Sequence, residues 1–152
     1  MAYCYWSGAA ACSKDAARSL ALARASAGEG SKYGQLTLGK LYRECEGGVE
    51  KDYAAALVQF RLAAAQGYDL AQNELGYMYH NGYGVAQDRA DALRWFKLAA
   101  AQGLGGALFN VGWFYEKGLG VAADRAEAIR WYKRAAAAGW HEAPAGLKRL
   151  GA

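Results

Sequence analysis

Apolar residues between positions 69 and 103 recur with the period of an α-helix in two stretches. In the first stretch Ala71, Leu75 and Tyr79 are spaced four residues apart, so they share one helix face. Gly82 and Gly84 follow, where a tight turn needs residues that accept a positive φ. The pattern predicts a helix over 69–81, a glycine loop and a second amphipathic helix. The apolar stripe of that second helix consists of Ala92, Leu93, Phe96, Ala99 and Ala100.

This unit returns along the chain with a shift of 36 residues. Gly76, for example, is matched by Gly112 downstream and by Gly39 upstream, where the loop is one residue longer. A glycine inside a helix costs ~1 kcal/mol, so its recurrence predicts a close backbone approach to a neighbouring helix. We expect a single repeat domain with these parts: a degenerate partial repeat at 1–30, repeats at 31–67, 68–103 and 104–139, and a C-terminal capping helix at 140–152.

Aspartate and glycine mark the predicted ends of the second helices. Asp88 and Asp124 stand at N-cap positions, and each is followed three residues later by a second acidic residue, which is a capping-box pattern. Gly103 stands where a C′ residue ends such a helix. Trp95 and Trp131 fall on these second helices and are interpreted as structural.

The repeated pattern A-x-x-x-L-G-x-x-Y-x-x-G-x-G-V-x-x-D-x-x-x-A-x-x-W-x-x-x-A-A-x-x-G resembles the Sel1-like repeat, a relative of the tetratricopeptide repeat. The copy at 107–139 departs from it at Val111, and the copy at 34–67 departs at Gly34 and Gln59. The resemblance implies an all-α fold, a right-handed α/α superhelix (solenoid) of stacked helix-turn-helix repeats, which usually serves as an interaction scaffold rather than an enzyme. The copy at 71–103 matches with Ala71, Leu75, Gly76, Tyr79, Gly82, Gly84, Val85, Asp88, Ala92, Trp95, Ala99, Ala100 and Gly103.

Composition agrees with a helical protein and excludes several classes. The 152 residues include 35 Ala, 20 Gly and a single Pro. The net charge is +4, and the longest basic runs are pairs, so no nucleic-acid partner is expected. Residues 98–115 carry no charge, but their glycines and the repeat register divide them between two helices, so no membrane span is expected. No secretory signal is visible, which favours an intracellular, cytoplasmic location.

Three cysteines, Cys4, Cys12 and Cys45, are too few and too scattered for a disulfide framework and fit a reducing compartment. A Cys12–Cys45 disulfide between adjacent loops is an alternative. The chain begins inside a first helix at Tyr3. This start suggests a piece of a longer repeat array, a capping segment of different structure, or a homodimer through the N-terminal end.

First helices of such repeats line a concave surface, and by analogy with tetratricopeptide repeats their inward positions are candidate partner-binding residues. A stacked series of Tyr3, Lys40, Tyr77, Trp113 and Arg149 would cross the groove and suit a peptide with an acidic or aromatic anchor. In the alternative interpretation, Tyr77 and Trp113 only pack against neighbouring repeats. The predicted binding residues are Lys40, Arg43, Asn73, Tyr77, His80, Phe109, Trp113, Glu116 and Arg149.

Few residues are left for chemistry. His80 lies one repeat from Glu116, but two side chains are too few for a metal centre, and no cofactor motif is present. The sequence therefore predicts a non-catalytic scaffold or adaptor that binds a peptide or helix of a partner protein. One alternative is a weak hydrolase of the cell-wall or β-lactam type, as suggested for cysteine-rich relatives that carry paired cysteines in each repeat. The other is a structural spacer within a larger protein.

Overall fold

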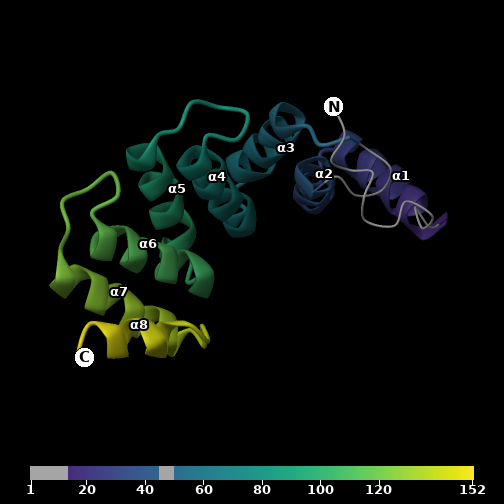
Figure 1. Cartoon of the computed structure of the whole chain (residues 1–152). Coiled ribbons are helices and arrows are strands. Elements are labelled where there is room, and N and C mark those ends of the chain that lie inside the picture. The colour runs from purple at the N-terminus through teal and green to yellow at the C-terminus, as the bar shows by residue number, and fades with distance from the viewer. Residues whose placement is uncertain (1–13, 45–49) are drawn as a thin grey trace.

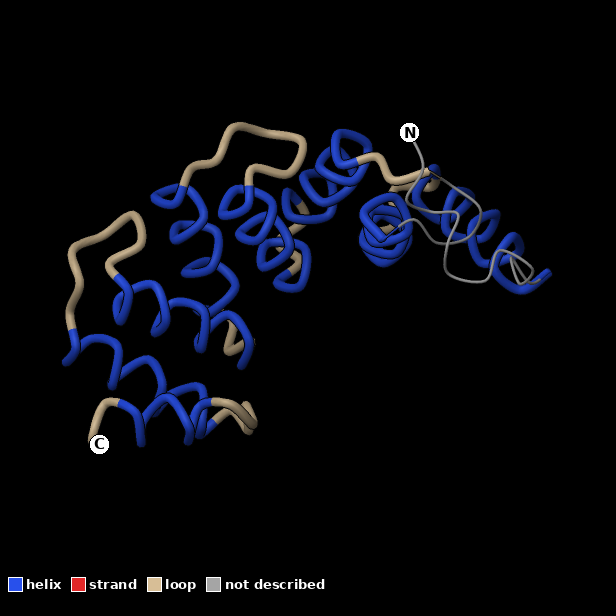
Figure 2. The backbone as a smooth tube through the Cα atoms, viewed as in Figure 1, coloured by secondary structure: helices blue, strands red, loops and turns tan. Residues whose placement is uncertain are grey.

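Helices make up the regular structure wherever the chain is described. The computed structural model describes residues 14–44 and 50–152, and no strand occurs in these two ranges. The helices follow one another along an arc, and long loops between α4 and α5 and between α6 and α7 project from its outer edge (Figures 1 and 2). The elements are α1 (Lys14–Gly28), α2 (Lys32–Glu44), α3 (Tyr53–Ala65), α4 (Asp69–Asn81), α5 (Arg89–Ala101), α6 (Gly105–Lys117), α7 (Arg125–Ala137) and α8 (Ala143–Arg149).

Each helix packs chiefly on the helices directly before and after it, so the fold is an all-α solenoid. The helix predicted at 69–81 is α4, with the same bounds. The uncharged stretch 98–115 is divided between α5 and α6 by a turn, as predicted. None of the described helices combines the length and the apolar character that a bilayer crossing requires. Tyr3, Cys4, Cys12 and Cys45 lie outside the described residues, and so do the predictions that rest on them.

The aspartate caps form, but the predicted capping box forms only in half. Asp88 accepts a hydrogen bond of 2.9 Å from the backbone N–H of Asp91. The Asp91 carboxylate does not return the bond, because it pairs with Arg94 at 2.9 Å, and the backbone N–H of Asp88 donates instead to the carbonyl oxygen of Tyr79. Asp124 caps α7 in the same way.

The helical glycines let their own backbone approach the paired helix, as predicted, and the group that each of them meets there is an aromatic ring. A Cβ atom at Gly76 would lie 2.5 Å from the ring of Phe96, a residue that is 1% exposed. Gly39 faces Phe60, and Gly112 faces Tyr132 in the same manner. The first helices α2, α4 and α6 thus each pack on the second helix that follows them through a buried ring that contacts a glycine.

Loop glycines join consecutive repeats. Gly120, at φ +65°, lies on the first turn of α5 in the preceding repeat, where an added Cβ would be 2.5 Å from the backbone nitrogen of Ala90. Gly84 lies in the same manner on the carbonyl of Tyr53 at the start of α3. Because both neighbours are backbone atoms, these positions require glycine for space as well as for conformation.

A pair of glutamine hydrogen bonds, called the glutamine clamp, recurs at the C-terminal ends of α3 and α5. Gln102 donates from Nε2 to the carbonyl of Gly67 and to Oε1 of the buried Gln72, both at 2.9 Å. Gln66 makes the corresponding pair of bonds one repeat earlier. After α7 the clamp is replaced by the ring of Trp140, which covers the start of α6.

The tryptophans of the second helices have the structural role that was predicted. Trp95 and Trp131 are half-buried against the core clusters. Arg134 lies over the Trp131 ring, 4.3 Å from its centroid.

Candidate functional site

Side chains from successive first helices meet on one face of the solenoid, called here the first-helix face and defined by the inward positions of α2, α4, α6 and α8. All nine predicted binding residues lie on these four helices. The contacts along the face differ from one pair of helices to the next.

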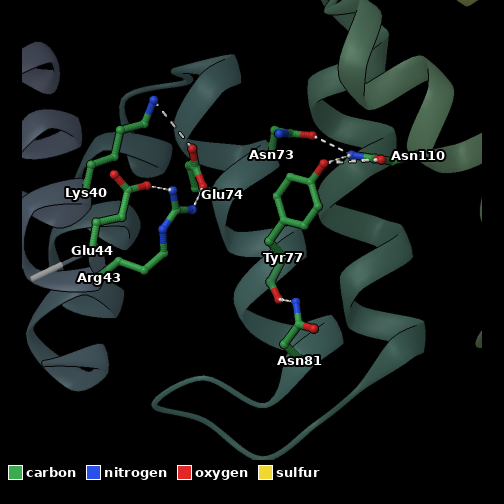
Figure 3. Close-up of polar contacts among 8 residues, drawn as sticks. All are labelled: Lys40, Arg43, Glu44, Asn73, Glu74, Tyr77, Asn81 and Asn110. Carbon is green, nitrogen blue, oxygen red and sulfur yellow. Dashed lines mark hydrogen bonds and ion pairs between the residues drawn. The ribbon is translucent and has the colours of Figure 1, made fainter. Parts of the chain in front are cut away.

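Between α2 and α4 the face is held by charge (Figure 3). Glu74 is buried, and its carboxylate pairs with Arg43 and, at 3.6 Å, with Lys40. Arg43 also pairs with Glu44. Since both predicted cations are directed to an internal carboxylate, this part of the face is a link between repeats.

Between α4 and α6 a polar cluster surrounds the buried Asn110 (Figure 3). Asn110 donates from Nδ2 to the hydroxyl of Tyr77 and to Oδ1 of Asn73, at 3.1 Å in both cases. The Tyr77 ring meets Phe96 edge-on at 5.3 Å, yet 39% of the residue is exposed. Tyr77 therefore packs within its own repeat, is linked to the next repeat through Asn110, and still offers an exposed surface.

His80 and Trp113 extend this contact along the same two helices. Their rings meet edge-on with centroids 5.4 Å apart, and the His80 ring also meets Phe114 at 5.3 Å. The Nδ1 atom of His80 is buried and has no hydrogen-bond partner among the described residues. Burial lowers the pKa of His80, and the positive charge of Arg89 lowers it further. The imidazole is thus neutral near pH 7, where it acts as packing.

Between α6 and α8 the face is held by Glu116, whose side chain is 7% exposed. Arg149 donates hydrogen bonds to both carboxylate oxygens of Glu116, at 2.8 and 2.7 Å. The Tyr132 hydroxyl donates to the same carboxylate at 2.6 Å, and the Lys117 ammonium lies 3.2 Å from it. The hydrogen bonds from Arg149 are the main cause that lowers the pKa of Glu116 from 4.5 to about 2. A carboxylate held in its ionised form fixes α8 in place and has no proton to give as a general acid near pH 7.

A hollow opens beside this ion pair, between α6 and α8, with a volume of about 500 Å³. Its walls combine two aromatic rings, three charged groups and one small residue. The hollow is lined by Phe109, Trp113, Lys117, Glu142, Ala145 and Arg149.

The structure brings three of the predicted residues, Phe109, Trp113 and Arg149, to one hollow and distributes the other six along the face. His80 contacts Trp113 and Phe114, whereas Glu116 is bound by Arg149. Sequence reasoning missed Glu142 and Ala145 in the hollow. Ala145 could have been found from the repeat pattern, because it stands one repeat after Phe109, a predicted binding residue.

Sequence reasoning also missed two buried polar residues on the first-helix face, Glu74 and Asn110. Glu74 and Asn110 occupy equivalent repeat positions. Glu74 accepts a hydrogen bond from Arg43, and Asn110 donates one to Tyr77, although Arg43 and Tyr77 were predicted to bind a partner. Nowhere in the described ranges do three or more His, Cys, Asp or Glu side chains gather as a metal site would need.

A sequence model of the Sel1 repeat matches residues 1–31, 33–68, 69–104 and 106–140. The chain belongs to the Sel1 repeat family. Proteins of this family are commonly protein-interaction scaffolds. No curated protein matches the chain.

Solved structures of Sel1 repeat proteins share the fold. A protective antigen of uropathogenic Escherichia coli with an SLR fold is 42% identical (TM-score 0.75), and the match covers 79% of this chain and 26% of the antigen. A Sel1 repeat protein of Oxalobacter formigenes is 33% identical (TM-score 0.71), over 76% of this chain and 47% of that protein. This chain thus spans about a quarter of the length of the antigen and about half of the length of the Oxalobacter protein. Cysteine-rich protein B of Helicobacter pylori, at 18% identity and TM-score 0.68, shares the fold over 91% of this chain and 98% of its own.

Proposed function

We propose that this chain is a non-catalytic interaction module that holds a peptide or helix of a partner protein along the concave, first-helix face. The observation that carries the proposal is the hollow of about 500 Å³ between α6 and α8, lined by Phe109 and Trp113. Aromatic residues beside charged groups in a recess are the usual composition of an interaction hot spot. Membership of the Sel1 repeat family supports the same function.

The rest of the first-helix face has a supporting role in this proposal. Lys40 and Arg43 hold α4 through Glu74, so they orient the face before any partner arrives. Tyr77, one repeat before Trp113, remains 39% exposed and extends the binding surface away from the hollow. A face fixed by its own contacts loses little entropy on binding, which favours affinity.

Panning a phage-displayed library of random 12-residue peptides on the immobilised full chain tests this function. We expect enriched peptides, and we expect Trp113→Ala to weaken their binding at least tenfold, as for a hot-spot residue. Arg94→Ala is the matched control, because the Arg94 side chain is 81% exposed on α5, a helix that contributes nothing to the hollow. Circular dichroism checks that each variant keeps its helices.

Two results would contradict the proposal. A spacer segment would enrich no peptide above the empty matrix. A hydrolase of β-lactams would turn over a chromogenic β-lactam, and that turnover would fall in a His80→Ala variant. We expect no turnover, because the Glu116 carboxylate is bound by Arg149 and Tyr132, and the His80 ring is packed against two aromatic rings with its Nδ1 atom buried.

A further inference from the structure

At the hollow, one position of the repeat register changes from a large residue to a small one. The inward row that passes through the hollow runs Leu36, Asn73, Phe109 and Ala145 on the four successive first helices. On α6 this position carries a phenyl ring, and on α8 it carries a single methyl group that is exposed. The space that a larger residue would take at position 145 is therefore open.

The two rings that border this space are fixed from behind. Phe109 packs on the buried ring of Tyr132, with centroids 5.1 Å apart. Trp113 meets His80 at 5.4 Å and Phe114 at 5.7 Å. Rings that are already immobilised present a rigid apolar surface, and a further aromatic ring packs favourably against such a surface.

Charge at the hollow is balanced. Lys117 and Arg149 both pair with the ionised Glu116, and Glu142 supplies a second negative charge at the rim. A ligand carboxylate would have to compete with Glu116 for the same two cations. The lining therefore suits an uncharged side chain better than an acidic one, although the sequence favoured an acidic or aromatic anchor equally.

We propose that the hollow between α6 and α8 is an anchor subsite for one aromatic side chain of a peptide partner. The inference rests on the proposed interaction function and names the chemistry that the face selects. In this subsite, Phe109 and Trp113 stack against the aromatic ring of the peptide, and the small Ala145 side chain leaves space for that ring. Arg149 acts as a positioning residue, because it holds α8 against Glu116 and so forms the far wall.

The same 12-residue library, panned on the full chain, tests the inference together with affinity measurements on three variants. Ala145→Phe fills the hollow from an exposed position, and Ala101→Phe adds the same ring at an exposed position of α5. We expect the enriched peptides to share one Phe, Tyr or Trp. Their affinity, measured by titration calorimetry, should fall at least tenfold in Ala145→Phe and stay within twofold in Ala101→Phe. Ala145→Leu should give an intermediate loss.

The outcomes separate this inference from the function on which it rests. Peptides that share Asp or Glu without an aromatic residue, or that bind Ala145→Phe as tightly as the native chain, overturn the aromatic subsite and leave the interaction function standing. A library that enriches nothing on the native chain overturns both.

Discussion

Replacing Gly120 by alanine should separate neighbouring repeats, and Gly118→Ala provides a matched control. Both glycines have φ +65°, so the cost of a left-handed alanine, about 1–2 kcal/mol, is shared by the two variants. They differ in what the new Cβ meets. At Gly118 it would lie 3.3 Å from the Cβ of Ala123, whereas at Gly120 it would lie 2.5 Å from backbone atoms of α5. The loop must therefore lift from α5, at a further cost of about 1–3 kcal/mol.

Urea unfolding followed by circular dichroism measures this difference. We expect Gly118→Ala to lower the unfolding midpoint and keep the m-value. Gly120→Ala should lower the midpoint further and also reduce the m-value, because a solenoid with a weakened interface unfolds less cooperatively. Equal losses of unfolding free energy in the two variants would refute the contact between the loop and α5 as a link between repeats.

Three further changes test other contacts. Gly76→Ala should destabilise the chain, because overpacking against Phe96 costs about 1–3 kcal/mol and the gain in helix propensity is only ~1 kcal/mol; Phe96→Leu in the same chain should recover part of the loss in urea unfolding. Gln102→Ala should cost about 1–3 kcal/mol, since it leaves a buried amide oxygen without its donor. The pKa of Glu116 in the folded chain, about 2, lies below its ordinary value of 4.5, so the ionised carboxylate stabilises the fold. This stabilisation is complete at pH values above 4.5 and is lost as the pH falls towards about 2. In Glu116→Gln the melting temperature should depend less on pH across that window.

Each of these predictions has a result that would contradict it. Additive effects of Gly76→Ala and Phe96→Leu would mean that the ring and the new methyl group do not compete for space. An unchanged midpoint in Gln102→Ala would show that the clamp contributes nothing to stability. Parallel pH profiles for the native chain and Glu116→Gln would mean that Arg149 does not stabilise the carboxylate.

The helices and their ends could be predicted from the sequence because their signals are local and repeated. The apolar period, the aspartate cap and the glycine after each second helix act within a few residues, and every repeat restates them. The bounds of α4, Asp69–Asn81, follow from its apolar period and from Gly82, which ends it. The ring that occupies the space beside Gly76 could not be assigned in the same way, because it depends on how two helices pack.

The candidate site was less accessible to sequence reasoning. Its helices and the inward direction follow from the register, but the partner of each side chain depends on the angle between repeats. Arg43 therefore appeared as a ligand-binding cation, although it pairs with Glu74, which lies 31 residues away along the chain. Ala145 escaped attention because a small residue carries no chemistry of its own. Its meaning appears only when it is compared with Phe109 in the same row.

The most direct test of the account is to map where a selected 12-residue peptide binds, by amide chemical-shift changes in the full chain. We predict that the largest changes fall on α6 and α8 around Trp113 and Ala145, with smaller ones on α4 near Tyr77. Changes concentrated on the exposed side of α5 and α7, around Arg94 and Arg130, would contradict the central claim that the first-helix face is the interaction surface.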